Sequence, residues 1–205
     1  MTEADEVEIN RQHAEKKARI KAARDRMMAE KTVEKGLLIV HSGNGKGKSS
    51  AAFGMALRCL GWGLRVGVVQ FIKGDRPTGE KLFFNRFPEL CRFVSMGEGF
   101  TWETQDRERD VQAAARAWDE SKKMIADPAF SMVVLDEINV ALKYELIDLE
   151  DVIAAIAARP ECCHVVCTGR GAPDALIEAA DLVTEMKLIK HPFKTGIKAQ
   201  AGVEF

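Results

Sequence analysis

The feature that most constrains this chain is a glycine-rich loop between a short apolar run and an apolar helical pattern. The apolar run covers 37–41, the loop reads Ser-Gly-Asn-Gly-Lys-Gly-Lys-Ser-Ser over 42–50, and the helical pattern begins at Ala51. Glycines let the backbone curl so that successive N–H groups face one anion, and the N-terminus of the following helix adds partial positive charge. This order of strand, loop and helix predicts a phosphate-binding loop, or P-loop.

Within the loop, Lys48 is expected to neutralise phosphate charge and the Ser49 hydroxyl to bind Mg2+. The strict Walker A pattern has its first glycine at the position of Ser42, so the loop is an atypical member of its class. The candidate residues for binding ATP are Gly43, Asn44, Gly45, Lys46, Gly47, Lys48, Ser49 and Ser50.

Two acids follow a second apolar run. Met132–Leu135 leads directly into Asp136 and Glu137, which resembles a Walker B strand ending at the carboxyl edge of a sheet. Asp136 is expected to hold Mg2+ directly or through water, opposite Ser49. For Glu137 two roles stay open: it positions an attacking water, as in hydrolases, or it completes the metal shell.

From Gly36 onward, short β-branched runs alternate with longer helical patterns, which indicates an α/β fold with a mostly parallel, RecA-like sheet and helices on both faces. The expected strands are Leu37–His41, Val66–Ile72, Arg92–Met96, Met132–Asp136, His164–Thr168 and Leu182–Met186. The expected helices are Ser49–Leu60, Glu80–Phe87, Thr104–Ala126, Leu149–Arg159 and Pro173–Ala180.

Residues 1–35 form a separate, charge-dense segment ahead of the expected P-loop domain at 36–205. Its pattern predicts a solvated helix with basic residues interleaved with alanines. Three roles stay open: an exposed helix with internal ion pairs, a lid over an anionic ligand, or an arm that contacts nucleic acid. The basic residues are Arg11, Lys16, Lys17, Arg19, Lys21, Arg24 and Arg26.

Charge and cysteine content narrow the class of partner. The formal net charge of -1 gives no general attraction to nucleic acid or to an anionic membrane. The five cysteines lack the paired spacing of a zinc site, and we expect them to be reduced. The sequence has no apolar leader and no run long enough to span a bilayer, so we expect no membrane partner and a cytoplasmic location.

Several sequence blocks together resemble the ATP:corrinoid adenosyltransferases, the family that includes cob(I)yrinic acid a,c-diamide adenosyltransferase. They occur in the family's order between residue 36 and the C-terminus, and only the first would be specific alone. The blocks are Gly43–Ser49, Gly99–Gln105, Val133–Glu137, Thr168–Gly171 and Gly196–Gln200.

The resemblance implies a reaction of cobalamin biosynthesis in which a Co(I) corrinoid attacks the 5′-carbon of ATP and releases triphosphate. Co(I) is itself a strong nucleophile, so the protein has to position the reactants and stabilise the leaving group. The resemblance also implies a nucleotide reversed relative to ordinary P-loop enzymes, with its α-phosphate toward Lys48, and it suggests a homodimer.

By the same resemblance, Phe100 and Trp102 wedge under the corrin and displace its lower axial ligand, leaving four-coordinate Co(II). A flavin-dependent reductant can then reach Co(I), because losing a σ-donor lowers the orbital that accepts the electron. On sequence alone, these two aromatics are equally compatible with packing on one face of a strand. Arg170, between two glycines, is a candidate anion contact.

Other classes of P-loop protein remain open on the sequence. A RecA-like ATPase acting on nucleic acid would produce ADP and phosphate. A nucleoside kinase is disfavoured by the missing C-x-x-C zinc lasso, and a nucleotide sensor would show no turnover. The tail residues His191 and Lys194 are compatible with closing over the site or with packing on a second subunit.

Overall fold

A computed structural model of the chain describes residues 3–72, 77–96 and 106–204. Its internal contacts form two compact units, Met1–Glu34 and Lys35–Phe205. The first unit contains helix α1 (Glu3–Ala29), whose side chains from position 5 onward are exposed and include an ion pair between Arg11 and Glu8. Among the described residues, no helix has the length and apolar character that crossing a membrane requires.

The second unit is built on a six-stranded sheet with the order β3-β2-β4-β5-β1-β6. Neighbouring strands pair in parallel throughout this sheet, which confirms the α/β class predicted from the alternating pattern. The strands are β1 (Leu38–Ser42), β2 (Val66–Gln70), β3 (Cys91–Ser95), β4 (Met132–Asp136), β5 (His164–Thr168) and β6 (Leu182–Glu185).

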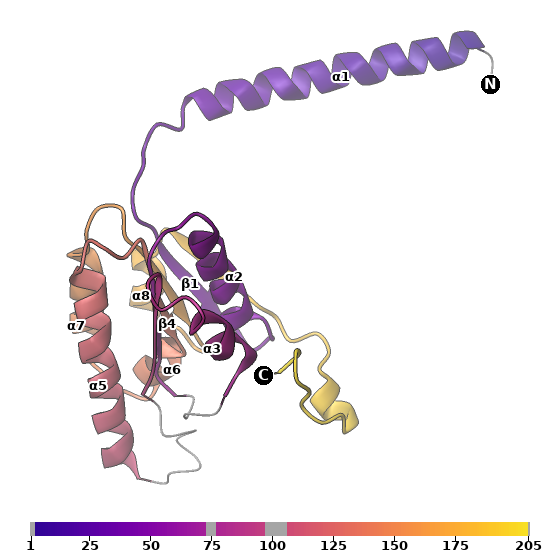
Figure 1. The fold of residues 1–205 in the computed structure, drawn as a ribbon. Coiled ribbons are helices and arrows are strands. Elements are labelled where there is room, and N and C mark those ends of the chain that lie inside the picture. The colour runs from indigo at the N-terminus through magenta and orange to yellow at the C-terminus, as the bar shows by residue number, and fades with distance from the viewer. Residues whose placement is uncertain (1–2, 73–76, 97–105, 205) are drawn as a thin grey trace. The chain divides into compact units, whose positions relative to one another are not determined.

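Helices cover both faces of this sheet (Figure 1). On one face, Phe53 of α2 and Phe84 of α3 pack with Val134 of β4 in one apolar cluster. On the other, Trp118 of α5 and Ile156 of α7 share a cluster with alternate residues of the same strands. Two-sided burial explains why the strands are almost continuously apolar.

Several expected elements were too long at their C-terminal ends, and one α-helix was missed. Strand β2 ends at Gln70 rather than at residue 72, and helix α3 ends at Phe84 rather than at residue 87. The missed helix, α6, begins directly after Glu137, one residue beyond the end of β4. No polar loop separates the apolar strand from the short apolar helix, so the sequence shows no separate helical pattern there. The helices are α2 (Lys48–Gly61), α3 (Gly79–Phe84), α5 (Arg107–Ala126), α6 (Ile138–Lys143), α7 (Leu149–Ala157) and α8 (Asp174–Ala179), with the 3-10 turn η1 (Pro192–Thr195).

The strand order fixes where the functional groups meet. Strand β5 lies between β1, which leads into the glycine-rich loop, and β4, which ends in the two acids. Because parallel strands present their carboxyl ends at one edge, the loop and the acids lie on the same side of the sheet.

We expect a chain lacking residues 1–34 to keep the fold of the second unit, because both apolar clusters draw their buried residues from Leu38 to Leu176. Circular dichroism and thermal unfolding should match those of the full chain. As a comparator, Leu38→Ala should cost about 2–5 kcal/mol through the cavity it opens. Loss of the cooperative transition on truncation would contradict the proposed division at residue 35.

A corrinoid titration of the truncated chain distinguishes two of the roles left open for residues 1–35. If the segment is a lid, the truncated chain should bind the corrinoid more weakly than the full chain. If it is only a solvated helix, the affinity should be unchanged.

Candidate functional site

The glycine-rich loop has the backbone that its sequence predicts. Gly43 and Gly47 have φ angles of 95° and 115°, a region that side chains other than glycine rarely adopt. The Gly45 N–H donates to the Met186 carbonyl at 2.6 Å, and a Cβ on Gly45 would lie 2.6 Å from the Lys187 carbonyl oxygen. The loop therefore packs directly against the chain that leaves β6, and only glycine fits this approach.

Lys48 is the first residue of α2 and points back into the loop. Its side chain is buried, and Nζ donates to the Gly45 carbonyl at 2.7 Å. Burial lowers the pKa of Lys48, and the Glu137 carboxylate opposes this shift. The ammonium group is thus fixed at the N-terminus of α2, where it and the helix dipole both attract a phosphate.

Ser42, the departure from the strict loop pattern, has a structural role. Its Oγ accepts a hydrogen bond from the Ala172 N–H at 3.2 Å. Ala172 closes the turn that carries Arg170, in which Gly169 and Gly171 have φ angles of 132° and 67°. A glycine at position 42 could not make this contact, so the serine ties the Arg170 turn to the phosphate loop.

The two acids after β4 occupy different environments. Asp136 is fully buried, and its two carboxylate oxygens accept from Thr168 Oγ1 at 2.8 Å and from Gln70 Nε2 at 2.9 Å. Glu137 has a φ of 65°, and its N–H donates to Thr168 Oγ1 at 3.0 Å. Glu137 lines a pocket, whereas the preceding residue, Asp136, is buried and does not line it.

That pocket, of about 240 Å³, collects most of the predicted site residues. Its hydroxyl and carboxylate oxygens, from Ser49 and Glu137, are the hard donors that Mg2+ prefers, so the donor set fits that ion. Its wall also holds the cations that a polyphosphate requires. The lining residues are Asn44, Gly45, Lys46, Gly47, Lys48, Ser49, Ser50, Glu80, Glu137, Arg170, His191, Val203 and Glu204.

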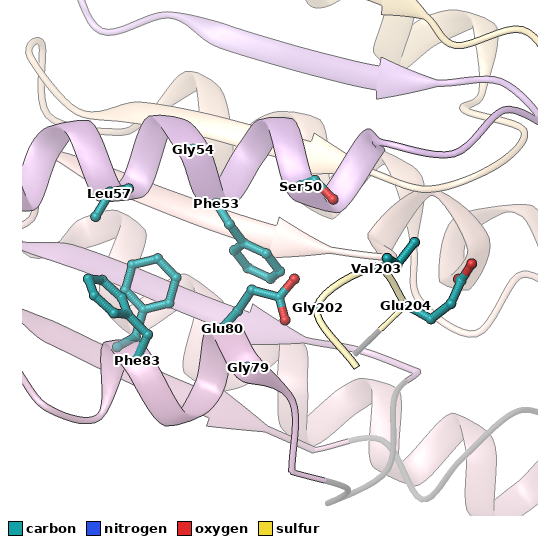
Figure 2. Close-up of a pocket in the computed structure, with 11 residues that line it drawn as sticks. Ser50, Phe53, Gly54, Leu57, Gly79, Glu80, Phe83, Gly202, Val203 and Glu204 are labelled. Carbon is teal, nitrogen blue, oxygen red and sulfur yellow. The ribbon is translucent and has the colours of Figure 1, made fainter. Parts of the chain in front are cut away.

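The C-terminal turn lies against the loop. Glu204 pairs with Lys46 at 2.8 Å and, with Val203, lines the phosphate pocket. A second pocket of about 410 Å³ adjoins it between α2 and α3, where Phe53, Leu57 and Phe83 form apolar walls (Figure 2). Val203 and Glu204 of this turn (201–204) line both pockets, so the turn lies where the polar and the apolar space adjoin.

The structure thus brings the loop residues, Arg170 and Glu137 together around one pocket, and Asp136 is buried next to Glu137 in the chain. Phe100 and Trp102 lie outside the described residues. His191 lines the phosphate pocket, whereas Lys194 lines a neighbouring pocket with Arg170.

Sequence reasoning gave no role to Gln70, Thr168 or Glu204. For Gln70 and Thr168 a signal existed, because each is a polar residue that ends an otherwise apolar strand. Glu204 carries no such signal, since its role depends on how the tail folds back.

Comparison with known proteins points to one family. The family model described as ATP:corrinoid adenosyltransferase BtuR/CobO/CobP matches residues 34–205. A corrinoid adenosyltransferase of Pseudomonas aeruginosa is 58% identical over 198 residues, covering 97% of this chain and 98% of that protein. The corrinoid adenosyltransferase CobA of Salmonella typhimurium is 44% identical over 193 residues, covering 94% and 97%.

The contact between Glu204 and Lys46 predicts competition with a bound polyphosphate. Glu204→Gln should tighten ATP binding by no more than about fivefold, because a partly exposed ion pair contributes only about 0.2–1 kcal/mol. Isothermal titration with ATP measures the change. Glu178→Gln, an exposed residue of α8 with the same loss of charge, is the control and should bind like the parent chain. Equal tightening in both variants would point to net charge rather than to the contact.

Proposed function

The chain belongs to the family of ATP:corrinoid adenosyltransferases, and we propose that its phosphate loop holds the triphosphate of ATP as a leaving group. It is a corrinoid adenosyltransferase, whose substrates are ATP and a corrinoid and which serves cobalamin biosynthesis. The observation that carries the proposed role of the loop is the convergence of Lys48, Arg170 and Glu137 on one pocket at the carboxyl edge of the sheet.

In the proposed reaction, the electron pair of Co(I) forms a bond to the 5′-carbon of ATP. The bond from that carbon to its oxygen breaks, and inorganic triphosphate departs with the electrons. The protein therefore has to align cobalt, carbon and oxygen and to stabilise the negative charge that grows on the triphosphate.

The chain's own groups suit that task. The loop residues from Asn44 to Ser49, Lys48 among them, line one concave space, and Arg170 adds a further cation to its wall. Fixed donors of this kind act without reorganising during the reaction. We place the α-phosphate toward Lys48, as the family resemblance implies.

We assign a Mg2+ site to Ser49, Asp136 and Glu137. Ser49 and Glu137 line the pocket, whereas Asp136 is buried below and would act through water or through its neighbours. When bound, Mg2+ would offset part of the triphosphate charge.

On the corrinoid side, we propose that Phe100 and Trp102 displace the lower axial ligand so that a flavin-dependent reductant can form Co(I). ATP and reduced flavins are intracellular metabolites, so we place the reaction in the cytoplasm. The homodimer suggested by the resemblance remains a prediction.

The alternative of a RecA-like ATPase acting on nucleic acid is not favoured. The relatives that match almost the whole chain are named corrinoid adenosyltransferases. The net charge of -1 also offers no general attraction to a polyanion.

Turnover should require a reduced corrinoid and should yield triphosphate, which anion-exchange chromatography distinguishes from orthophosphate. Lys48→Ala should lower kcat by about a hundredfold or more, because it removes a fixed charge directed at the leaving group. Lys123→Ala, on the exposed face of α5, is the matched control and should retain full activity. Corrinoid-independent release of ADP and orthophosphate would instead support the ATPase.

Trp102→Ala should separate reduction from alkyl transfer. The rate should fall sharply when a weak flavin reductant must generate Co(I) on the enzyme. It should fall far less when Co(I) is supplied by a strong chemical reductant, since the phosphate apparatus is intact. The ratio of the two losses is the measured quantity, and equal losses would reduce Trp102 to a binding or packing role.

A further inference from the structure

A row of polar side chains crosses four neighbouring strands at the carboxyl edge of the sheet. Ser95 Oγ of β3 donates to Gln70 Oε1 of β2 at 3.0 Å. Gln70 Nε2 donates to Asp136 Oδ2 of β4 at 2.9 Å, and Thr168 Oγ1 of β5 donates to Asp136 Oδ1 at 2.8 Å. Asp136 is therefore held from both sides by residues of its two neighbouring strands.

The parallel register creates this row. Gln70 is paired with Ser95 on one side and with Asp136 on the other. Side chains directly opposite one another in adjacent strands point to the same face of the sheet, so these groups meet without any loop rearrangement. The row continues the line of Val68 and Val134, which pack in the apolar cluster under α2 and α3.

Burial makes the arrangement specific. Gln70 is 2% exposed, and both ends of its amide are used. Because an ionised carboxylate only accepts hydrogen bonds, the amide nitrogen must face Asp136 and the amide oxygen must face Ser95. An unpaired amide or carboxylate here would be costly, so the row has one favourable orientation.

We propose that Gln70 is a positioning residue for the adenosyl transfer, with its own orientation set by Ser95. It holds the Asp136 carboxylate so that Asp136, with Ser49 and Glu137, organises the metal–triphosphate complex. Gln70 itself does not line the phosphate pocket. This inference rests on the proposed metal site.

One end of the row is close in sequence to the aromatic residues proposed to act on the corrinoid. Ser95 is the last residue of β3, and the segment that follows it in sequence contains Phe100 and Trp102. Hydrogen bonds link the end of β3 to Asp136 through Gln70. The position of that strand end and the orientation of the Asp136 carboxylate therefore depend on each other.

The test uses Mn2+ in place of Mg2+, because free Mn2+ gives an electron paramagnetic resonance signal that is lost on binding. Titration of the full chain with Mn2+ and ATP, without corrinoid, reports metal–nucleotide binding with no turnover. Gln70→Met keeps the side-chain length and removes both hydrogen bonds. We expect it to weaken Mn2+ binding by about ten- to a hundredfold, the usual loss when the partner of a metal ligand is removed.

Val68→Ala is the matched control. Val68 lies on the same strand and face, two residues before Gln70, and is fully buried, but it contacts no member of the row by hydrogen bond. It should lower the melting temperature while leaving Mn2+ affinity unchanged. If Val68→Ala weakens Mn2+ binding as much as Gln70→Met does, the effect is structural and the inference is overturned.

Ser95→Ala removes only a hydroxyl group and serves as the second variant if Gln70→Met does not fold. We expect a smaller loss of Mn2+ affinity in the same direction, and an unchanged affinity would overturn the role assigned to Ser95. If Gln70→Met folds and binds Mn2+ as the parent chain does, the inference is overturned. The proposed function would still stand if the parent chain forms triphosphate. Failure of the parent chain to bind Mn2+ with ATP would overturn both the inference and the proposed metal site.

Discussion

The parallel register of the six strands is the constraint on which the site depends. It ends β1, β4 and β5 at one edge, so a loop, two acids and the Arg170 turn meet although they are far apart in sequence. The hydrogen bonds between these parts then fix the details: Ser42 holds the Arg170 turn, and Thr168 receives the Glu137 N–H while donating to Asp136. A shift of one residue in β4 would turn Asp136 to the opposite face and dissolve this arrangement.

In the proposed mode of binding, a triphosphate meets two ammonium groups that already have partners. The Lys48 ammonium is already bound by the Gly45 carbonyl, and Lys46 is already paired with Glu204. A triphosphate displaces the Glu204 carboxylate from Lys46 and accepts from the Lys48 donors that the Gly45 carbonyl leaves free. It gains most from Lys48, because a buried ammonium interacts through a lower effective dielectric than an exposed one. Lys46 is 41% exposed, so its exchange adjusts affinity while Lys48 carries the main interaction.

Much of this organisation could be predicted from sequence, because it depends on local pattern. Continuous β-branched runs predicted the six strands within about two residues, and the glycine spacing predicted the loop. The register could not be predicted, since any pair of short valine-rich strands can align in several ways. The row from Ser95 to Thr168 was therefore missed, although Gln70 and Thr168 each end an apolar strand.

The two acids after β4 show how far such prediction can reach. Sequence alone predicts a metal role for Asp136 and leaves two roles open for Glu137, but it does not predict how differently the two acids are placed. The structure separates them: the φ of 65° at Glu137 turns that residue toward the pocket, while the row holds Asp136 at full burial. A fully buried carboxylate with a hydrogen bond on each oxygen cannot move to meet a ligand without breaking those bonds. Asp136 therefore serves as the fixed point of the site, and the residues that line the pocket, Glu137 among them, are positioned around it.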